Sequence, residues 1–142
     1  MTITKNKDWK HDLEFGEESE HWFKELCGDT IEIKTERDIW ATTGNIAVET
    51  HDTRKGKPSG ISTTTAKYQA HVLQAGDERL AVIILKTDTL KDIIEDDERT
   101  LHPMGDKNAD GSSAHGYLVR INEIINKLGH IGRRIIDGES RT

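Results

Sequence analysis

The feature of this sequence that most restricts its fold is the continuous apolar run RLAVIILKT at residues 79–87. It has the length of a strand, and an apolar run without polar alternation is typical of a strand buried on both faces of a sheet. Hydrophobic residues make up only 33% of the chain and charged residues 32%, so the core is thin. We therefore expect residues 79–87 to form a central strand.

The other segments show either the alternation of a strand or the caps and period of a helix. The further predicted strands are 30–36, 44–50 and 117–121. The predicted helices are 14–28, 62–76, 88–99 and 122–131, and the predicted loops are 51–61 and 101–116. This order indicates an α/β fold, a mixed β-sheet flanked by helices. We expect a single domain over residues 1–142, with its core at about 14–128 and polar termini.

Two of the predicted strands carry acidic residues at alternating positions. In TIEIKTE (30–36), Glu32, Lys34 and Glu36 share one face. If this strand pairs with GNIAVET (44–50) as an open hairpin, Glu32 and Glu49 come close together. Such alternation usually means a face exposed to water. Like charges at cross-strand distance are destabilising, however, unless a divalent cation or Lys34 compensates them.

The loop at 51–61 is the most basic stretch of the chain. Its basic residues are Arg54, Lys55 and Lys57. Ser59 and Gly60 precede the predicted helix and could hold a phosphate at its start. Lys67, on that helix, is a further candidate for contact with backbone phosphate, although an exposed ion-paired lysine fits the pattern equally well. Carboxylates that bind Mg²⁺ beside a lysine are what metal-assisted phosphodiester hydrolysis needs.

The strings IEIKTE, TGNIAVE, GKPSGIS and TAKY, in this order, resemble the PD-(D/E)XK nuclease superfamily. The likeness is greatest to small phage-type members described as Holliday-junction-resolvase-like, and it covers about residues 14–87. It implies a restriction-endonuclease-like fold and Mg²⁺-dependent cleavage of DNA, with Mn²⁺ able to replace Mg²⁺. It also implies a structure-selective endonuclease that acts on branched DNA.

The resemblance allows two assignments of the site, because the Pro-Asp pair of the family is missing. In the first, Glu32 and Lys34 are the E-x-K pair, and Glu49 or Glu36 is the other acid. In the second, Glu32 and Glu49 are the two acids. His51 then stands where lysine is expected, and Lys34 supplies the amine from the neighbouring strand. We favour the second, because the separation of Glu32 and Glu49 suits a hairpin.

Both assignments make Glu32, Lys34 and Glu49 catalytic, with Glu32 and Glu49 as metal ligands. Glu17, in the preceding helix, is expected to be a further catalytic and metal-binding acid, with Glu20 as the alternative. Acids in the first turn of a helix also interact favourably with the helix dipole, and this is the competing explanation.

The bulk properties narrow the class of protein. A net charge of −6 argues against a protein that coats nucleic acid. The single cysteine, Cys27, permits no intrachain disulfide and is expected to be buried. The N-terminus has no apolar signal segment, which favours a cytoplasmic protein, in the host cytoplasm if phage-encoded, with no membrane partner.

DNA is the expected partner, and cleavage of two strands suggests a homodimer. The competing function is an inactive nuclease-fold module that binds DNA or protein. DKNADG at 106–111 matches half of a calcium loop, but Tyr117 occupies the position of the required Glu. We therefore interpret that segment as a flexible loop.

Overall fold

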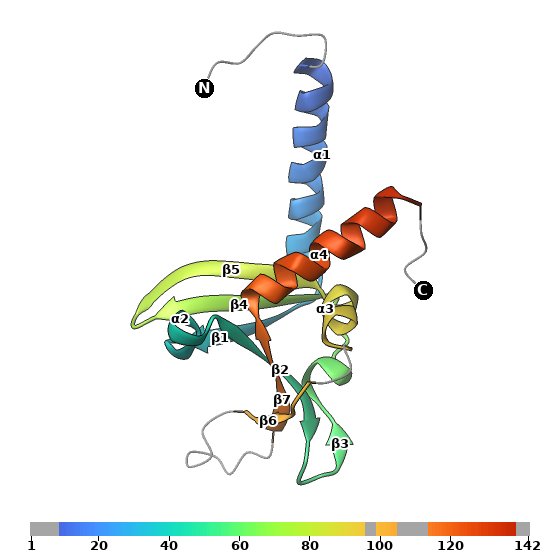
Figure 1. Cartoon of the computed structure of the whole chain (residues 1–142). Helices are drawn as coiled ribbons and strands as arrows, with labels where there is room; N and C mark the ends of the chain where they lie inside the picture. Colours follow the sequence, from blue (N-terminus) through green and yellow to red (C-terminus); the bar gives the residue numbers. More distant parts are fainter. Residues whose placement is uncertain (1–8, 96–98, 105–113, 139–142) are drawn as a thin grey trace.

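The computed structural model describes residues 9–95, 99–104 and 114–138 (Figure 1). Its helices are α1 (Trp9–Gly28), α2 (Ile39–Thr43), α3 (Thr87–Ile94) and α4 (Ile121–Ile136), with the 3₁₀ helix η1 (Gly60–Ser62). Its strands are β1 (Ile31–Arg37), β2 (Asn45–Asp52), β3 (Lys57–Pro58), β4 (Tyr68–Ala75), β5 (Glu78–Lys86), β6 (His102–Pro103) and β7 (Ala114–Arg120). The described chain is thus a mixed α/β protein, as expected.

The first sheet has the strand order β1-β4-β5, with β1 parallel to β4 and β5 antiparallel to it. The predicted helix at 62–76 is therefore wrong: η1 ends at Ser62, and residues 68–75 form the central strand. The prediction of residues 79–87 as a strand is confirmed, but not its central place. As β5 it lies at the sheet edge, where Leu80 and Val82 are 59% and 53% exposed.

The second sheet is antiparallel and has the order β3-β2-β7-β6. The predicted hairpin is wrong, because β1 and β2 belong to different sheets. The residues between them form α2, which ends at Gly44 in the left-handed region (φ 72°). The indole Nε1 of Trp40 donates a hydrogen bond of 2.8 Å to the Gln74 carbonyl, which ties α2 to the first sheet.

The core lies where β2, β7, α3 and α4 meet the first sheet. Ile46 of β2, Leu90 and Ile93 of α3, and Val119 of β7 are at most 1% exposed. Full burial of such a side chain contributes about 1.5–3 kcal/mol. This packing holds β2 against the first sheet without a hydrogen-bonded ladder between β2 and β1.

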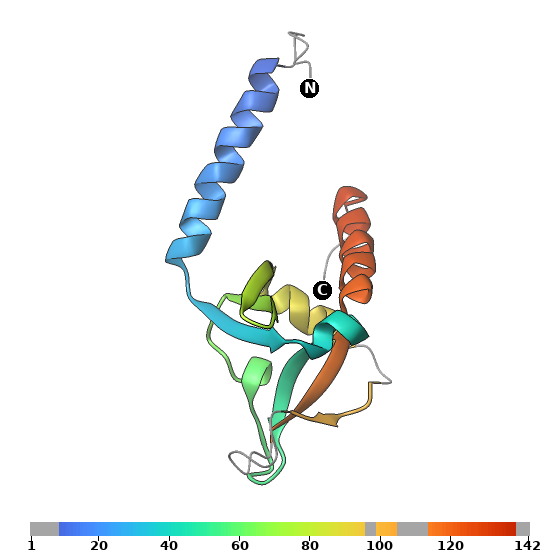
Figure 2. The same cartoon turned by 90° about the vertical axis from the view of Figure 1, so that its left-hand side faces the viewer.

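The terminal helices α1 and α4 extend from the sheets and stand apart from each other (Figures 1 and 2). Among the described side chains of α1, that of Leu26 is buried, and Trp22 and Phe23 are about half exposed. The predicted burial of Cys27 is wrong, since this residue is exposed. None of the described helices is long and apolar enough to span a membrane. The DKNADG segment lies outside the described residues.

Candidate functional site

The predicted site residues Glu32, Lys34 and Glu49 line one small recess, although their strands do not pair. We call it the acidic recess. Its lining residues are Glu32 and Lys34 from β1, Ala47, Val48 and Glu49 from β2, Gly60 and Ile61 from η1, and Gln69 and His71 from β4. Its volume is about 10 Å³, which is room for about one water molecule.

Strand alternation explains how β1 and β4 contribute to the recess. Glu32 and Lys34 lie on the same face of β1 because they are two residues apart. The parallel register sets Glu32 beside Gln69 and Lys34 beside His71. The polar face of β1 is therefore continued on β4 and partly covered by β2.

Two glycines fix the backbone of Glu49. A Cβ atom on Gly60 would lie 2.8 Å from Cβ of Glu49, and one on Gly116 would lie 2.7 Å from its Cα. Real Cβ contacts are essentially never shorter than 3.0 Å. The β2–β7 register also shifts between Glu49 and His51, as at a β-bulge. Close packing on both sides, together with this irregularity, fixes the point at which the Glu49 side chain projects from β2.

The charges of Glu32 and Lys34 interact directly. Nζ of Lys34 lies 3.4 Å from Oε1 of Glu32, with the two side chains 43% and 29% exposed. Burial alone would raise the pKa of Glu32, but a hydrogen bond with Thr64 and the charge of Lys34 together lower it by more. The pKa of Glu32 therefore lies below its ordinary value, and Glu32 is a carboxylate at neutral pH.

A second carboxylate of β1 holds a histidine of β4. Oε1 of Glu36 lies 2.9 Å from Nδ1 of His71 and accepts a 3.1 Å hydrogen bond from the Ala47 backbone N–H. His71 is 2% exposed, and its Nε2 atom is buried without a hydrogen-bond partner among the described residues. The pattern at 62–76 predicts a helix, in which His71 has no expected role at the site. The alternation of Gln69 and His71 with Ala70 and Val72 is the signal that predicts the strand.

The predicted helix acids and Lys67 lie elsewhere. Glu17 and Glu20 are exposed residues of α1 and do not line the acidic recess. Lys67 precedes β4, where its Nζ lies 3.4 Å from Oδ1 of Asp29, and it lines a different pocket. The structure therefore does not bring these three residues to Glu32 and Glu49.

The predicted phosphate-binding residues lie on and beside the β2–β3 connection. Residues 53–57, the basic turn, carry exposed Arg54, Lys55 and Lys57. The Asp52 side chain accepts hydrogen bonds from two backbone N–H groups of this turn, at 3.1 and 3.2 Å. Ser59 has a buried Oγ and is followed by the three-residue helix η1, so the longer helix that was expected to begin after it is wrong.

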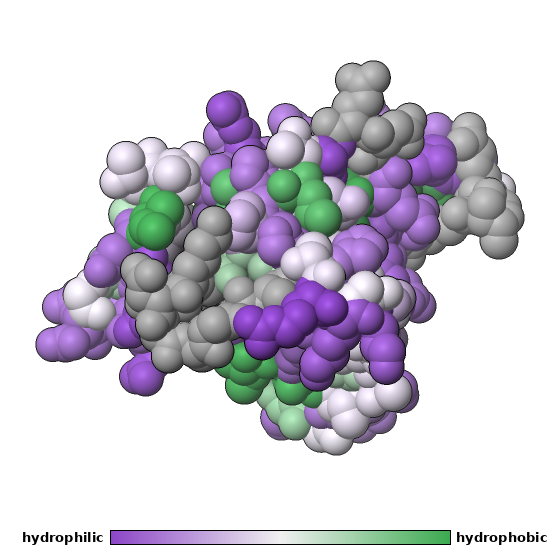
Figure 3. Space-filling model, turned by 90° about the horizontal axis from the view of Figure 1, so that it is seen from below, coloured by the Kyte–Doolittle hydropathy of each residue, from purple (hydrophilic) through white to green (hydrophobic). Residues whose placement is uncertain are grey.

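The surface around the basic turn is strongly polar. This turn lies at the lower end of the molecule in Figure 1, and the view from below shows large hydrophilic groups with smaller hydrophobic ones between them (Figure 3). Such a surface is compatible with a charged partner.

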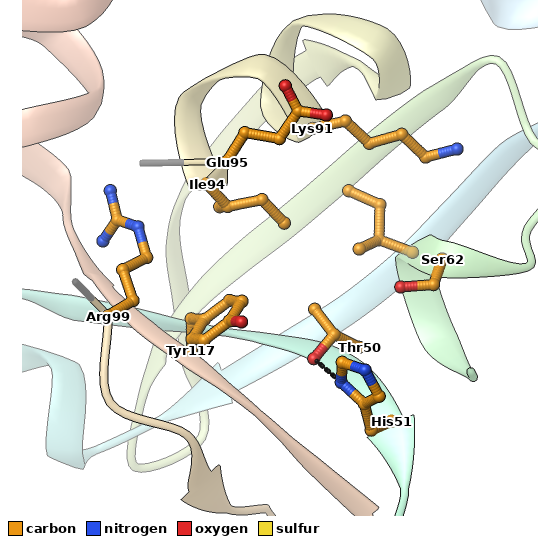
Figure 4. Close-up of a pocket in the computed structure, with 9 residues that line it drawn as sticks. Thr50, His51, Ser62, Lys91, Ile94, Glu95, Arg99 and Tyr117 are labelled. Atoms are coloured by element: carbon orange, nitrogen blue, oxygen red, sulfur yellow. Dashed lines mark hydrogen bonds between the residues drawn. The ribbon is translucent and has the colours of Figure 1, made fainter. Parts of the chain in front are cut away.

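A larger pocket of about 440 Å³ lies beside the acidic recess, and both are lined by Ile61. Figure 4 shows Lys91 and Glu95 of the α3 region on one side and Thr50 and His51 of β2 on the other. Its Arg99 already donates hydrogen bonds to the Glu123 carboxylate. None of the predicted catalytic residues lines this pocket, whereas Glu32, Lys34 and Glu49 line the acidic recess.

The donor chemistry of the acidic recess suits a divalent metal, since it combines two glutamates with an imidazole nitrogen that has no partner among the described residues. Among the side chains that the structure describes, no three of His, Cys, Asp or Glu are already close enough to hold an ion. Metal binding would therefore require the flexible glutamates to change rotamer.

Fold and site together define a mixed α/β protein with two sheets flanked by helices and an acidic recess between strands of both sheets. Comparisons with protein-family models, curated proteins and solved structures found no match.

Proposed function

We propose that this protein is a metal-dependent DNA endonuclease of restriction-endonuclease-like fold that hydrolyses phosphodiester bonds, with a preference for branched DNA. The observation that supports the proposal best is the meeting of Glu32, Lys34 and Glu49 in one recess from two different sheets. The sequence pattern predicts these three residues as the acids and the amine of a phosphodiesterase site. Their convergence does not depend on the hairpin that was wrongly expected.

In this proposal, Glu32 and Glu49 hold the metal, which is Mg²⁺ or Mn²⁺. The bound ion would polarise the phosphate and lower the pKa of the attacking water. Glu32 is suited to bind a cation because it is ionised at neutral pH, with its pKa below the ordinary value. Lys34, whose side chain is 43% exposed, can reach outward to a phosphate oxygen and stabilise the negative charge that develops there.

The basic turn would bind the DNA backbone at a distance from the cut. A recess of about 10 Å³ cannot hold a nucleotide, so the DNA must lie over its mouth. Strand β2 runs three residues beyond Glu49 to Asp52, a rise of about 10 Å at about 3.3 Å per residue, and the turn that carries Arg54 and Lys55 follows. They would contact phosphates beyond the scissile one, where local positive charge offsets the acidic net charge.

A second candidate function is a nuclease-fold module that binds DNA or protein without cutting. It is favoured by the lack of a preassembled group of three metal-binding side chains among the described residues, and by the net charge of −6.

One assay separates the two. Supercoiled plasmid and a four-way junction are incubated with the protein in Mg²⁺ or Mn²⁺. Lys34→Met and Glu49→Gln are compared with Lys24→Met and Glu78→Gln, which change exposed residues of α1 and β5 outside the recess. Cleavage that both recess variants abolish and both controls retain supports the endonuclease. Binding without cleavage supports the module, and absence of binding refutes both DNA functions.

The proposed active form is a homodimer, because cutting two strands requires two sites. Sedimentation of the protein with and without junction DNA tests this, and a monomer in both conditions refutes it.

A further inference from the structure

His71 is the most completely buried polar side chain of the acidic recess, and one of its two ring nitrogens has a partner. Nδ1 faces Glu36 at 2.9 Å, and the ring is 2% exposed. Nε2 is shielded from solvent and has no partner among the described residues. Leaving a buried polar atom unpaired costs about 1–3 kcal/mol. A histidine with a purely structural role would ordinarily use both nitrogens, so the orphaned Nε2 points to a missing ligand.

The position of His71 is fixed through the Glu36 carboxylate. Glu36 is itself held by the backbone N–H of Ala47, so one carboxylate connects a strand of each sheet to the imidazole. When Nδ1 carries the proton and donates a hydrogen bond to the Glu36 carboxylate, Nε2 keeps a free lone pair. A carboxylate that orients a histidine in this way is the usual support of a metal-bound imidazole.

We propose that Nε2 of His71 is a nitrogen ligand of the divalent metal in the acidic recess, with Glu36 as its positioning residue. The inference rests on the proposed function, because Glu32 and Glu49 supply the other ligands. The recess has the size of one water or one monoatomic ion, and His71 lines it together with both glutamates. His71 thereby takes the place of the helix acid Glu17, which lies outside the recess.

This ligand set determines metal preference. Magnesium prefers oxygen ligands, whereas manganese and later first-row metals accept imidazole nitrogen. The wild-type protein should therefore bind Mn²⁺ more tightly than Mg²⁺. Glu36→Gln, which keeps the size of the side chain but removes its charge, should weaken Mn²⁺ binding by about 10–100-fold.

The test measures Mn²⁺ bound to the full chain by electron paramagnetic resonance. Nitrogen coupling is read from the electron spin-echo modulation, and selective ¹⁵N-histidine labelling identifies its source. His71→Gln is compared with His51→Gln, a control that changes an exposed histidine of β2 beside the recess. The expected result is histidine nitrogen coupling in the wild type and in His51→Gln, and its loss in His71→Gln.

Four results would overturn the ligand assignment: no Mn²⁺ bound by the wild type, bound Mn²⁺ without nitrogen coupling, coupling that persists in His71→Gln, or unchanged affinity in Glu36→Gln. The labelled wild type and Glu36→Gln keep the test decisive if His71→Gln fails to fold. DNA cleavage is measured on the same samples. Nitrogen coordination without cleavage refutes the endonuclease alone, and cleavage without nitrogen coordination refutes the ligand assignment alone.

Discussion

Replacement of Gly60 by alanine tests how the acidic recess is built. Gly60 combines a left-handed backbone (φ 55°) with direct packing against Glu49, so that an added Cβ would lie 2.8 Å from the Glu49 Cβ and still closer to its carbonyl oxygen. The neighbouring atoms are backbone of β2, which cannot move aside as the end of a flexible side chain can. The substitution must therefore either strain η1 or displace Glu49.

The expected loss of stability in Gly60→Ala has two contributions. A left-handed conformation costs a non-glycine residue about 1–2 kcal/mol. Overpacking against fixed atoms adds about 1–3 kcal/mol. For a chain of this size, each kcal/mol lowers Tm by about 3 °C, so Gly60→Ala should lower Tm by about 6–15 °C. Displacement of Glu49 by about 1 Å should also reduce the proposed cleavage by about a hundredfold.

Gly76→Ala is the matched control. Gly76 lies between β4 and β5 with nearly the same backbone angle (φ 56°), but a Cβ there would meet nothing within 4 Å. Gly76→Ala should lower Tm by only about 3–6 °C, because only the cost of the left-handed conformation applies there. Thermal unfolding of both variants isolates the contact with Glu49. Equal losses of Tm in the two variants would show that Gly60 does not support Glu49 in this way.

Three further predictions concern stability, each measured by urea unfolding. Hydrogen bonds from Arg99 hold the pKa of Glu123 below its ordinary 4.5, so this pair stabilises the fold above that pH and loses its effect as pH falls through the lowered pKa. The free energy of unfolding of Glu123→Gln should be lower than that of the wild type by about 1–3 kcal/mol at pH 7, and this difference should vanish in acid. A difference that does not depend on pH contradicts this. Trp40→Phe removes the hydrogen bond to the Gln74 carbonyl and should cost about 1–2 kcal/mol, and no loss would show that α2 is not held by it. Leu90→Ala, at a fully buried position, should cost about 2–5 kcal/mol, whereas a loss below 1 kcal/mol would place Leu90 outside the core.

Local patterns predicted much of the secondary structure. Alternation identified β1 and β2, and the apolar run identified β5, because period and length are properties of the strand itself. The prediction failed at β4, where Gln69 and His71 obtain partners from Thr87 and Glu36, 18 and 35 residues away. Partners at such separations are created by the fold, so the local alternation can indicate a strand here but not that its polar residues are buried.

The meeting of Glu32 and Glu49 was predicted from the wrong geometry, and the difference matters for the chemistry. Facing residues in a hairpin have Cβ atoms about 4.5–5.5 Å apart on one face of a single sheet, so an ion shared by their carboxylates would lie above that sheet. Strands in packed layers are about 10 Å apart, so inward-pointing glutamates can reach toward a shared ion from opposite sides. The same arrangement lets the middle strand β4 contribute Gln69 and His71, which a simple hairpin of β1 and β2 would lack. Because the two acids belong to different sheets, an ion that they share would lie between strands of both sheets, where His71 of β4 offers a nitrogen donor.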